Sequence, residues 1–222
     1  MLTLVPTPVG NLEDITLRAL RILREADLIA AEDTRHAGIL LKHHGISRPL
    51  LSLHEHNEAV RTEEISERLA AGENIALLTD AGMPGISDPG YRMVRACLAH
   101  GLEFTVLPGP SAVLPALVGS GLPLHEFYFG GFLPVKSGRR RAALERALAR
   151  PETSIFFESP HRIARSLEVL AEVAPERPVC VARELSKKFE EYWRGTAAEL
   201  SARANAQPPR GEICLLVGGG EA

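Results

Sequence analysis

Residues 77–90 read LLTDAGMPGISDPG, a short apolar run that ends at Asp80 and a loop that contains three glycines and two prolines. Proline lacks a backbone N–H and glycine loses the most conformational freedom on ordering, so this loop is neither helix nor strand throughout. Glycine also lets a ligand approach the main chain closely, while proline restricts the shape of the loop. The stretch predicts a preformed backbone wall after a buried strand, which is typical of a small-molecule site.

Two further loops of this kind follow predicted strands, PTPVGN at 6–11 after the first strand and PGPSA at 108–112 after the fifth. In open α/β sheets, ligands bind outside the carboxyl ends of the strands, where such loops expose N–H and C=O groups. Strand and helix patterns alternate along the rest of the chain, and the apolar runs are continuous rather than alternating. This pattern predicts an α/β fold whose sheets are buried on both faces.

The length of 222 residues suits one large domain or two small domains that share a cleft. The texture of the sequence changes at GSGLPLH, residues 119–125, which is the best candidate for a linker. We therefore predict an N-terminal α/β domain over residues 1–119 and a C-terminal α/β domain over residues 120–222.

Composition and cysteine usage indicate a cytoplasmic protein. No apolar run approaches the roughly 20 residues that span a membrane. The first residues, MLTLVPTPVGN, have neither the basic start nor the apolar core of a signal peptide. The three cysteines lie apart in apolar runs, as expected for buried thiols in a reducing compartment.

Common nucleotide and nucleophile motifs are absent, since the chain has no G-x-G-x-x-G after its first strand, no P-loop and no G-x-S-x-G. His54 and His56 would lie on one face of a strand, but two histidines are a weak metal signal, and we predict no metal. In AEDTR at 31–35, helix capping explains Asp33 and Thr34. It does not explain Glu32 and Arg35.

Charge is distributed unevenly on a chain whose net charge is −3. The segment from Lys136 to Arg150 holds six basic residues and one acidic residue. A solvated helix face is one interpretation of such a run. Phosphate contacts beside a nucleic-acid substrate are the other.

Nine motifs occur in an order that resembles the tetrapyrrole-methylase superfamily, over residue 2 to about residue 217. They are TPVGNLEDIT, AEDTR, HEHNE, LLTDAGMPGISDPG, PGPSA, GFLP, FFESPHR, ARELSKKFEE and RGEI. Within the superfamily, the chain is most similar to the bacterial branch that 2′-O-methylates a cytidine of 16S ribosomal RNA in the small subunit.

This resemblance implies two α/β domains with S-adenosylmethionine in the cleft between them, a homodimer and no metal. Carried over by position, the cofactor-binding residues are Pro8, Asp80, Ala81, Gly82, Ile86, Ser111, Ala112, Phe157 and Leu185. The substrate implied is small-subunit ribosomal RNA or the assembled subunit.

A ribose 2′-hydroxyl is a poor nucleophile that benefits from a base or from a nearby cation. We assign this activating role to Lys187 or Lys188, with Glu184 or Asp80 as orienting groups, because a desolvated lysine can lose its proton near neutral pH. The alternative is that both lysines bind RNA phosphates. The residues expected to contact RNA phosphates are Arg35, Arg139, Arg140, Arg141 and Arg162.

Three departures from the family pattern bear on these expectations. PTPVGN is not the glycine-rich first loop of the tetrapyrrole enzymes, which argues against a tetrapyrrole substrate. Arg210 replaces the lysine of a K-G-E motif, and the chain lacks a C-terminal helical segment that many members carry, so we expect any RNA contact made by that segment to be absent or replaced. Two alternatives stay open, a tetrapyrrole-type small-molecule methyltransferase and a non-catalytic RNA-binding protein that senses S-adenosylmethionine.

Overall fold

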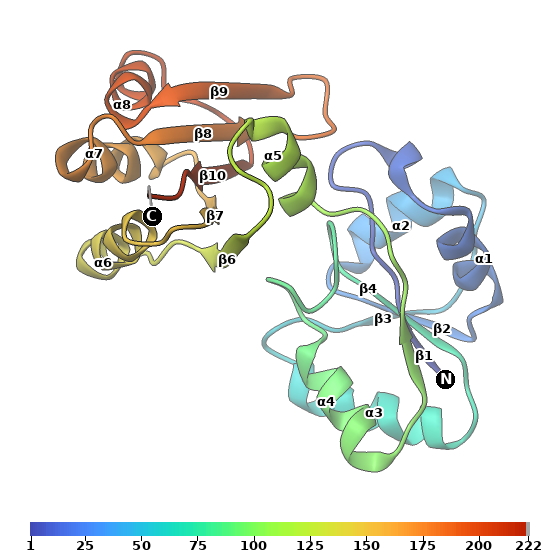
Figure 1. The fold of residues 1–222 in the computed structure, drawn as a ribbon. Helices are drawn as coiled ribbons and strands as arrows, with labels where there is room; N and C mark the ends of the chain where they lie inside the picture. The colour runs from blue at the N-terminus through green and yellow to red at the C-terminus, as the bar shows by residue number, and fades with distance from the viewer. Residues whose placement is uncertain (221–222) are drawn as a thin grey trace. The chain divides into compact units, whose positions relative to one another are not determined.

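The structure is a computed structural model that describes residues 1–220. The chain divides into two compact units, one from Met1 to Ser111 and one from Ala112 onward. Each unit is a five-stranded sheet with helices on both faces, so the predicted α/β class is confirmed (Figure 1). No helix within residues 1–220 is long and apolar enough to cross a membrane.

The first unit is built on an all-parallel sheet with the strand order β3-β2-β4-β1-β5. Its strands are β1 (Leu2–Leu4), β2 (Leu28–Ala31), β3 (Leu50–Ser52), β4 (Ile75–Leu78) and β5 (Phe104–Val106). Its helices are η1 (Leu12–Asp14), α1 (Leu17–Glu25), α2 (Thr34–His43), α3 (Glu58–Ala70) and α4 (Tyr91–His100). Because all strands are parallel, the loops that follow β1, β2, β4 and β5 meet at one edge of the sheet.

Both faces of this sheet are buried, as the continuous apolar runs predict. In β2, Ile29 and Ala31 pack in a core with α1 and α2, whereas Leu28 and Ala30 pack in a second core with α3 and α4. The alternation follows from the two-residue period of a strand. Thr16 caps α1 by accepting from the Ala19 N–H, as predicted.

One local prediction is wrong. β3 ends at Ser52, so His54 and His56 lie in the turn before α3 and do not share one face of a strand. Asn57 causes the turn, because its amide oxygen accepts from the His54 N–H at 2.8 Å and its Nδ2 donates to the Ser52 carbonyl at 3.2 Å.

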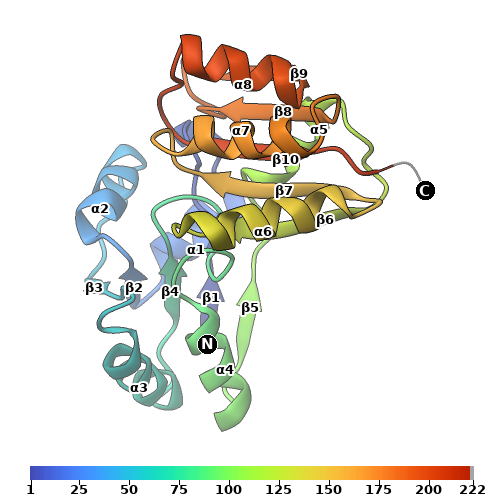
Figure 2. The same cartoon turned by 90° about the vertical axis from the view of Figure 1, so that its left-hand side faces the viewer.

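The second unit has a mixed sheet with the order β6-β7-β10-β8-β9, in which only β6 and β7 pair in parallel. Its strands are β6 (Phe127–Phe132), β7 (Thr153–Glu158), β8 (Pro178–Arg183), β9 (Glu191–Thr196) and β10 (Ile213–Val217). Its helices are α5 (Val113–Ser120), α6 (Ser137–Leu148), α7 (Ile163–Val173) and α8 (Ala197–Ala206). Helices α6, α7 and α8 cover one face of this sheet and α5 covers the other (Figure 2).

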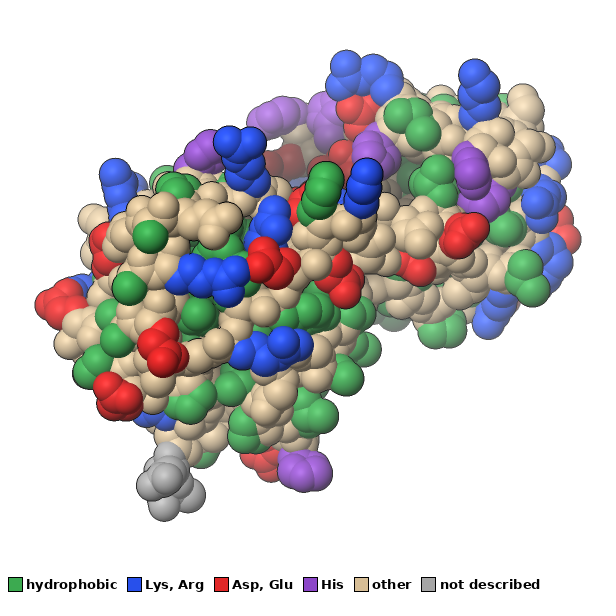
Figure 3. Space-filling view, turned by 90° about the horizontal axis from the view of Figure 1, so that it is seen from above, with side chains coloured by type: hydrophobic (Ala, Val, Ile, Leu, Met, Phe, Trp, Pro, Cys, Tyr) green, Lys and Arg blue, Asp and Glu red, His purple; other side chains and the backbone are tan. Residues whose placement is uncertain are grey.

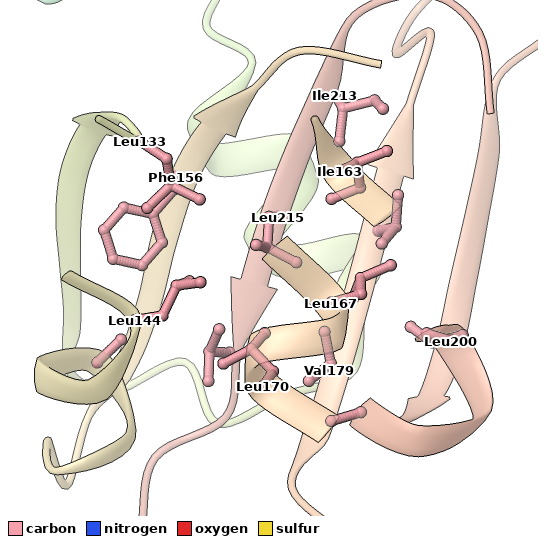
Figure 4. Packing of buried hydrophobic residues seen from close by; sticks show 14 of the residues in the cluster. Leu133, Leu144, Phe156, Ile163, Leu167, Leu170, Val179, Leu200, Ile213 and Leu215 are labelled. Atoms are coloured by element: carbon pink, nitrogen blue, oxygen red, sulfur yellow. The ribbon is translucent and has the colours of Figure 1, made fainter. Parts of the chain in front are cut away.

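The main core of the second unit lies under α7. Ile163, Leu167 and Leu170 of this helix point toward the sheet, where they meet Leu215 of the central strand β10 (Figure 4). All four side chains are fully buried. Burial of side chains of this size contributes roughly 2 kcal/mol each, so α7 is firmly anchored.

Helix α5 packs on the sheet of the second unit, although the predicted boundary at residue 119 assigns it to the first domain. Its residues Val113, Ala116 and Leu117 are buried against Cys180 and Cys214 of β8 and β10. The hydroxyl of Tyr192 in β9 also donates to the Pro115 carbonyl at 3.1 Å. We therefore propose that the domain boundary lies near Ser111.

Candidate functional site

Reciprocal backbone hydrogen bonds join the loops after β1 and β4 at the carboxyl edge of the first sheet. The Thr7 N–H donates to the Gly82 carbonyl at 3.0 Å, and the Gly82 N–H donates to the Thr7 carbonyl at 2.9 Å. The buried Thr7 hydroxyl adds a bond to the Thr79 carbonyl at 3.0 Å. The predicted cofactor residues Pro8, Ala81 and Gly82 are therefore neighbours.

The loop that follows Asp80 closes on itself. Gly82, Gly85 and Gly90 adopt φ angles of 77°, 84° and 134°, which residues with a Cβ rarely adopt. The Gly85 N–H donates to the Pro89 carbonyl at 3.2 Å, and a Cβ on Gly90 would stand 3.2 Å from the Gly85 nitrogen. Each glycine is thus required by the shape of the loop, and Ile86 projects from it with 53% of its surface exposed.

The loop after β5 approaches the loop after β1 just as closely. A Cβ on Gly109 would lie 2.9 Å from the Cβ of Pro6, so only glycine fits there. Since β1 lies between β4 and β5 in the sheet, PTPVGN, DAGMPGISDPG and PGPSA form one continuous edge. Ser111 and Ala112, at the end of the third loop, are partly buried.

Asp80 connects this edge to the loop after β2, because its Oδ1 accepts from the Asp33 N–H at 3.2 Å. Asp33 in turn caps α2 by accepting from the Arg35 N–H at 2.8 Å. The guanidinium of Arg35 bonds the same carboxylate at 2.6 Å and holds the pKa of Asp33 well below its ordinary range. The Arg35 side chain is 90% exposed, so its outer edge is open to a ligand.

Glu32 is a candidate that the sequence analysis left without a role. Burial, followed by repulsion from Asp88 and Asp80, raises the pKa of Glu32 to about 6. Its Oε2 is buried without a hydrogen-bond partner in the described part of the chain. Such a carboxylate is ionised at neutral pH and accepts a proton more readily than an ordinary glutamate. The only signal in the sequence is that capping explains Asp33 and Thr34 but not Glu32.

In the second unit, the segment between β8 and β9 holds the predicted catalytic residues in a strained backbone. Glu184 and Ser186 have φ angles of 51° and 65°, although neither is glycine. The Glu184 N–H donates to the Glu212 carbonyl and its Oε1 accepts from the Glu212 N–H, both at 3.0 Å. Non-glycine residues held in this region cost about 1–3 kcal/mol each and cluster at functional sites.

Lys187 lies in the centre of this segment and bonds two carboxylates, Glu184 Oε1 and Glu212 Oε2, both at 2.9 Å. Desolvation by itself would lower the pKa of Lys187, but the bonds to Glu184 and Glu212 outweigh it and raise the pKa. For Glu184, desolvation by itself would raise the pKa, but the hydrogen bonds, chiefly the one from Lys187, outweigh it and lower the pKa. Lys187 is therefore a cation, and the expectation that it loses its proton near neutral pH is wrong for this arrangement.

Lys188 differs from its neighbour. It is exposed, its Nζ lies 5.6 Å from the centroid of the Phe189 ring, and it forms no ion pair within residues 1–220. The nearby Leu185 is buried with Val113 and Ala116, so its side chain belongs to the core of the second unit. Phe157 is partly buried against the same core and contacts Phe132, with ring centroids 5.3 Å apart.

The three consecutive arginines of α6 do not form one basic surface. Arg139 is exposed, but Arg140 is only 5% exposed and donates to the Val135 carbonyl at 3.1 Å. Arg140 shares the core-facing side of α6 with Leu144, so its prediction as a surface phosphate contact is wrong. Arg141 pairs with Glu145 at 2.9 Å and Glu172 at 2.8 Å. On the face that Figure 3 presents, Lys and Arg side chains are interspersed with Asp and Glu.

Arg162 precedes α7 and forms an ion pair with the buried Glu158 at 2.7 Å. Its side chain is 20% exposed. Apart from Phe157 in β7, the predicted residues therefore fall into three groups, one at the edge of the first sheet, one around Lys187, and the basic residues of α6 and α7. No group of three or more metal-binding side chains is assembled among residues 1–220.

Comparisons with known proteins agree with the sequence motifs. A sequence profile of the tetrapyrrole (corrin/porphyrin) methylases matches residues 1–201. The "Ribosomal RNA small subunit methyltransferase I" of Escherichia coli O157:H7 is 48% identical over all of this chain and 78% of that protein. The protein of the same name from Thermotoga maritima is 44% identical over 99% of each chain.

Solved structures show the same fold at low sequence identity. The uroporphyrin-III-C-methyltransferase of Thermus thermophilus has a TM-score of 0.68 at 24% identity, covering 98% of this chain and 94% of its own. Diphthine synthase has a TM-score of 0.73 at 14% identity, covering 98% and 89%. The predicted resemblance is confirmed: the chain belongs to the tetrapyrrole methylase family, in the group whose curated members are named ribosomal RNA small subunit methyltransferase I.

Proposed function

We propose that this methyltransferase transfers a methyl group from S-adenosylmethionine to the ribose 2′-hydroxyl of a cytidine in 16S ribosomal RNA of the small subunit. The observation that carries the proposal is the 44–49% identity to proteins of that name over nearly the whole chain. The three-loop edge and the ARELSKK segment both lie within the matched length. A tetrapyrrole substrate is the main alternative, and the non-glycine-rich PTPVGN loop disfavours it.

The edge of the first sheet fits S-adenosylmethionine. The predicted residues that lie on this edge are Pro8, Asp80, Ala81, Gly82, Ile86 and Ser111. The loop 80–90 is the principal wall, and Ile86 provides exposed apolar surface. When bound, S-adenosylmethionine supplies a methyl group already activated by its sulfonium. The loop needs no rearrangement to receive it, because its glycines and prolines already hold its shape, and such positioning lowers the barrier for an in-line transfer.

Lys187 acts in this proposal as a fixed cation and not as a base. A positive charge near the 2′-oxygen lowers the pKa of the hydroxyl and stabilises the oxyanion that develops during transfer. Glu184 orients the ammonium, and Lys188 contacts a phosphate of the RNA. The proton of the hydroxyl then leaves to solvent.

The remaining parts of the proposal concern the partners. Arg35, Arg139, Arg141 and Arg162 bind phosphates of the RNA, and the protein acts as a homodimer in the cytoplasm. Replacing Arg139, whose side chain is exposed, is expected to lower the salt dependence of RNA binding without changing the affinity for S-adenosylmethionine.

The test is transfer of labelled methyl groups by the pure protein into small ribosomal subunits, naked 16S RNA and a tetrapyrrole precursor in parallel. Label recovered as nuclease-resistant 2′-O-methylcytidine supports the proposal, and the more active RNA form identifies the substrate. Label in the tetrapyrrole alone would replace the proposal with the small-molecule alternative. RNA binding that depends on S-adenosylmethionine, without methyl transfer to any substrate, would support the alternative of a non-catalytic RNA-binding protein that senses S-adenosylmethionine.

A further inference from the structure

Glu158 is a fully buried carboxylate at the carboxyl end of β7. Its Oε1 accepts from the Ser159 N–H at 2.8 Å and pairs with Arg162 Nη2 at 2.7 Å. Its Oε2 accepts from the Ser166 hydroxyl at 2.7 Å, and Ser166 is itself fully buried. Both oxygens are thus occupied, which fixes the carboxylate in one orientation.

Arg162, unlike Glu158, has a hydrogen-bonding group without a partner among residues 1–220. Its Nε is buried without a hydrogen-bond partner, and Glu158 is its one ion-pair partner within the described residues. A guanidinium carries five N–H donors in a rigid plane, so most of the donors of Arg162 are not taken up by Glu158. One fifth of the side-chain surface is exposed. The structure therefore presents an oriented, partly exposed arginine whose donors are not all taken up by Glu158.

The position of this arginine contradicts the usual placement of charge on helices. Arg162 is the N-cap residue of α7, and Arg165 lies in the first turn, where the helix dipole disfavours cations. His161 and Arg165 are both exposed beside Arg162. A local rule broken at several adjacent positions is expected where function compensates for the cost. An anion at this end of the helix would be stabilised by the dipole and by the arginines together.

From these contacts we infer that Glu158 is a positioning residue, which holds the Arg162 guanidinium toward a phosphate of the RNA substrate. Ser166 and the Ser159 N–H fix the carboxylate, the carboxylate fixes Nη2, and the planar guanidinium presents its outer donors. Helix α7 supplies a rigid support, since Ile163 and Leu167 flank Ser166 on the buried side of the helix (Figure 4). This inference rests on the proposed function, because it takes RNA as the substrate.

The sign of the effect separates positioning from simple electrostatics. Glu158→Gln removes a negative charge, so charge alone would strengthen binding to RNA. Loss of positioning instead weakens RNA binding, because Arg162 is no longer held. Glu168→Gln is the matched control: it removes the same charge from α7, and Glu168 is exposed and bonds Asn205 rather than an arginine.

The experiment measures the KM for small ribosomal subunits, the kcat and the Kd for S-adenosylmethionine of the wild type and both variants. We expect Glu158→Gln to raise the KM for subunits about fivefold to tenfold, with kcat and the Kd for S-adenosylmethionine unchanged. Glu168→Gln should leave the KM unchanged or slightly lower. In an Arg162→Ala background, Glu158→Gln should have no further effect on KM, because the two residues act as one unit.

A structural role for Glu158 predicts a different pattern, in which Tm falls while the KM for subunits matches that of Glu168→Gln. That result would overturn the inference. If Glu158→Gln does not fold, Arg162→Lys provides the test, since it keeps the charge and loses the planar donors; an unchanged KM would then overturn it. Absence of methyl transfer by the wild type would refute the proposed function instead, so the two failures are distinguishable.

Discussion

The loop after β4 and the segment between β8 and β9 both contain residues with positive φ angles, but they place different residue types at those positions. In the first, every left-handed position is a glycine, namely Gly82, Gly85 and Gly90. In the second, Glu184 and Ser186 occupy left-handed positions; the Glu184 side chain accepts from Lys187, and the Ser186 backbone N–H donates to Glu190 Oε2. Glycine makes a loop whose shape costs little and whose function lies in its backbone. The second segment tolerates backbone strain because the Glu184 side chain is needed there to bond Lys187.

The largest expected effect concerns the side chain that this strained segment holds. Lys187→Ala should lower kcat about 100-fold, because the fixed cation that stabilises the developing oxyanion is lost, while the Kd for RNA changes little. Lys188→Ala is the control and should mainly raise the KM for RNA. Measured single-turnover rates and RNA binding decide between them. If Lys187→Ala weakens RNA binding without slowing transfer, the lysine is a phosphate contact. The strained segment would then have no role in the methyl-transfer step.

Gly211→Ala tests whether the strained segment depends on close packing. Gly211 has a φ angle of 86°, and a Cβ there would overlap the side chain of Glu184. We expect a loss of about 2 kcal/mol in the free energy of unfolding, together with a fall in kcat, because Glu184 no longer holds Lys187.

Gly101→Ala is the matched control for Gly211→Ala. Its φ angle is 64° and no atom lies within 4 Å of the added Cβ. It should cost about 1 kcal/mol through backbone strain and leave kcat unchanged. Equal effects of the two variants on kcat would show that the contact with Glu184 does not matter.

Gly82→Ala tests the loop after β4, in which glycines occupy the positions with positive φ angles. The added Cβ would make only an ordinary contact with Val9 at 3.6 Å, so the cost is the φ angle of 77°. We expect a loss of about 1 kcal/mol in stability and a weaker affinity for S-adenosylmethionine, measured by calorimetry. Gly138→Ala, in a helix with open space around it, should be neutral or slightly stabilising. Unchanged affinity in Gly82→Ala would remove this loop from the cofactor site.

The smallest effect concerns Glu32, whose pKa of about 6 in the fold exceeds its ordinary value of 4.5. The folded state therefore binds the proton more tightly, and the stability that this group contributes falls as pH rises from about 4.5 to about 6. Glu32→Gln should be more stable than the wild type by about 1 kcal/mol at pH 8, with the difference vanishing near pH 4.5. Urea unfolding at the two pH values measures it. A variant less stable than the wild type at pH 8 would show that the carboxylate is not strained.

Much of the fold and part of the site follow from local sequence chemistry. The continuous apolar runs predicted two-faced sheets, Thr16 predicted the start of α1, and the glycines and prolines of 80–90 predicted a rigid loop after a strand. These features depend on steric and hydrogen-bonding preferences that act over a few residues, so they can be read without knowing what packs around them. The ordered motifs identified the family by resemblance.

Tertiary structure alone decided the charge state and the availability of the functional side chains. Arg139, Arg140 and Arg141 look equivalent in the sequence, but one is exposed, one is buried and one is paired, because the helix period directs them to different surroundings. Lys187 stays protonated because two carboxylates bond its ammonium group, Glu184 nearby and Glu212, which is distant in the chain. Burial, followed by repulsion from Asp88 and Asp80, which β4 and its loop bring to the same edge, raises the pKa of Glu32. Burial and electrostatics depend on distances in space, and those distances are set by packing between elements far apart in sequence.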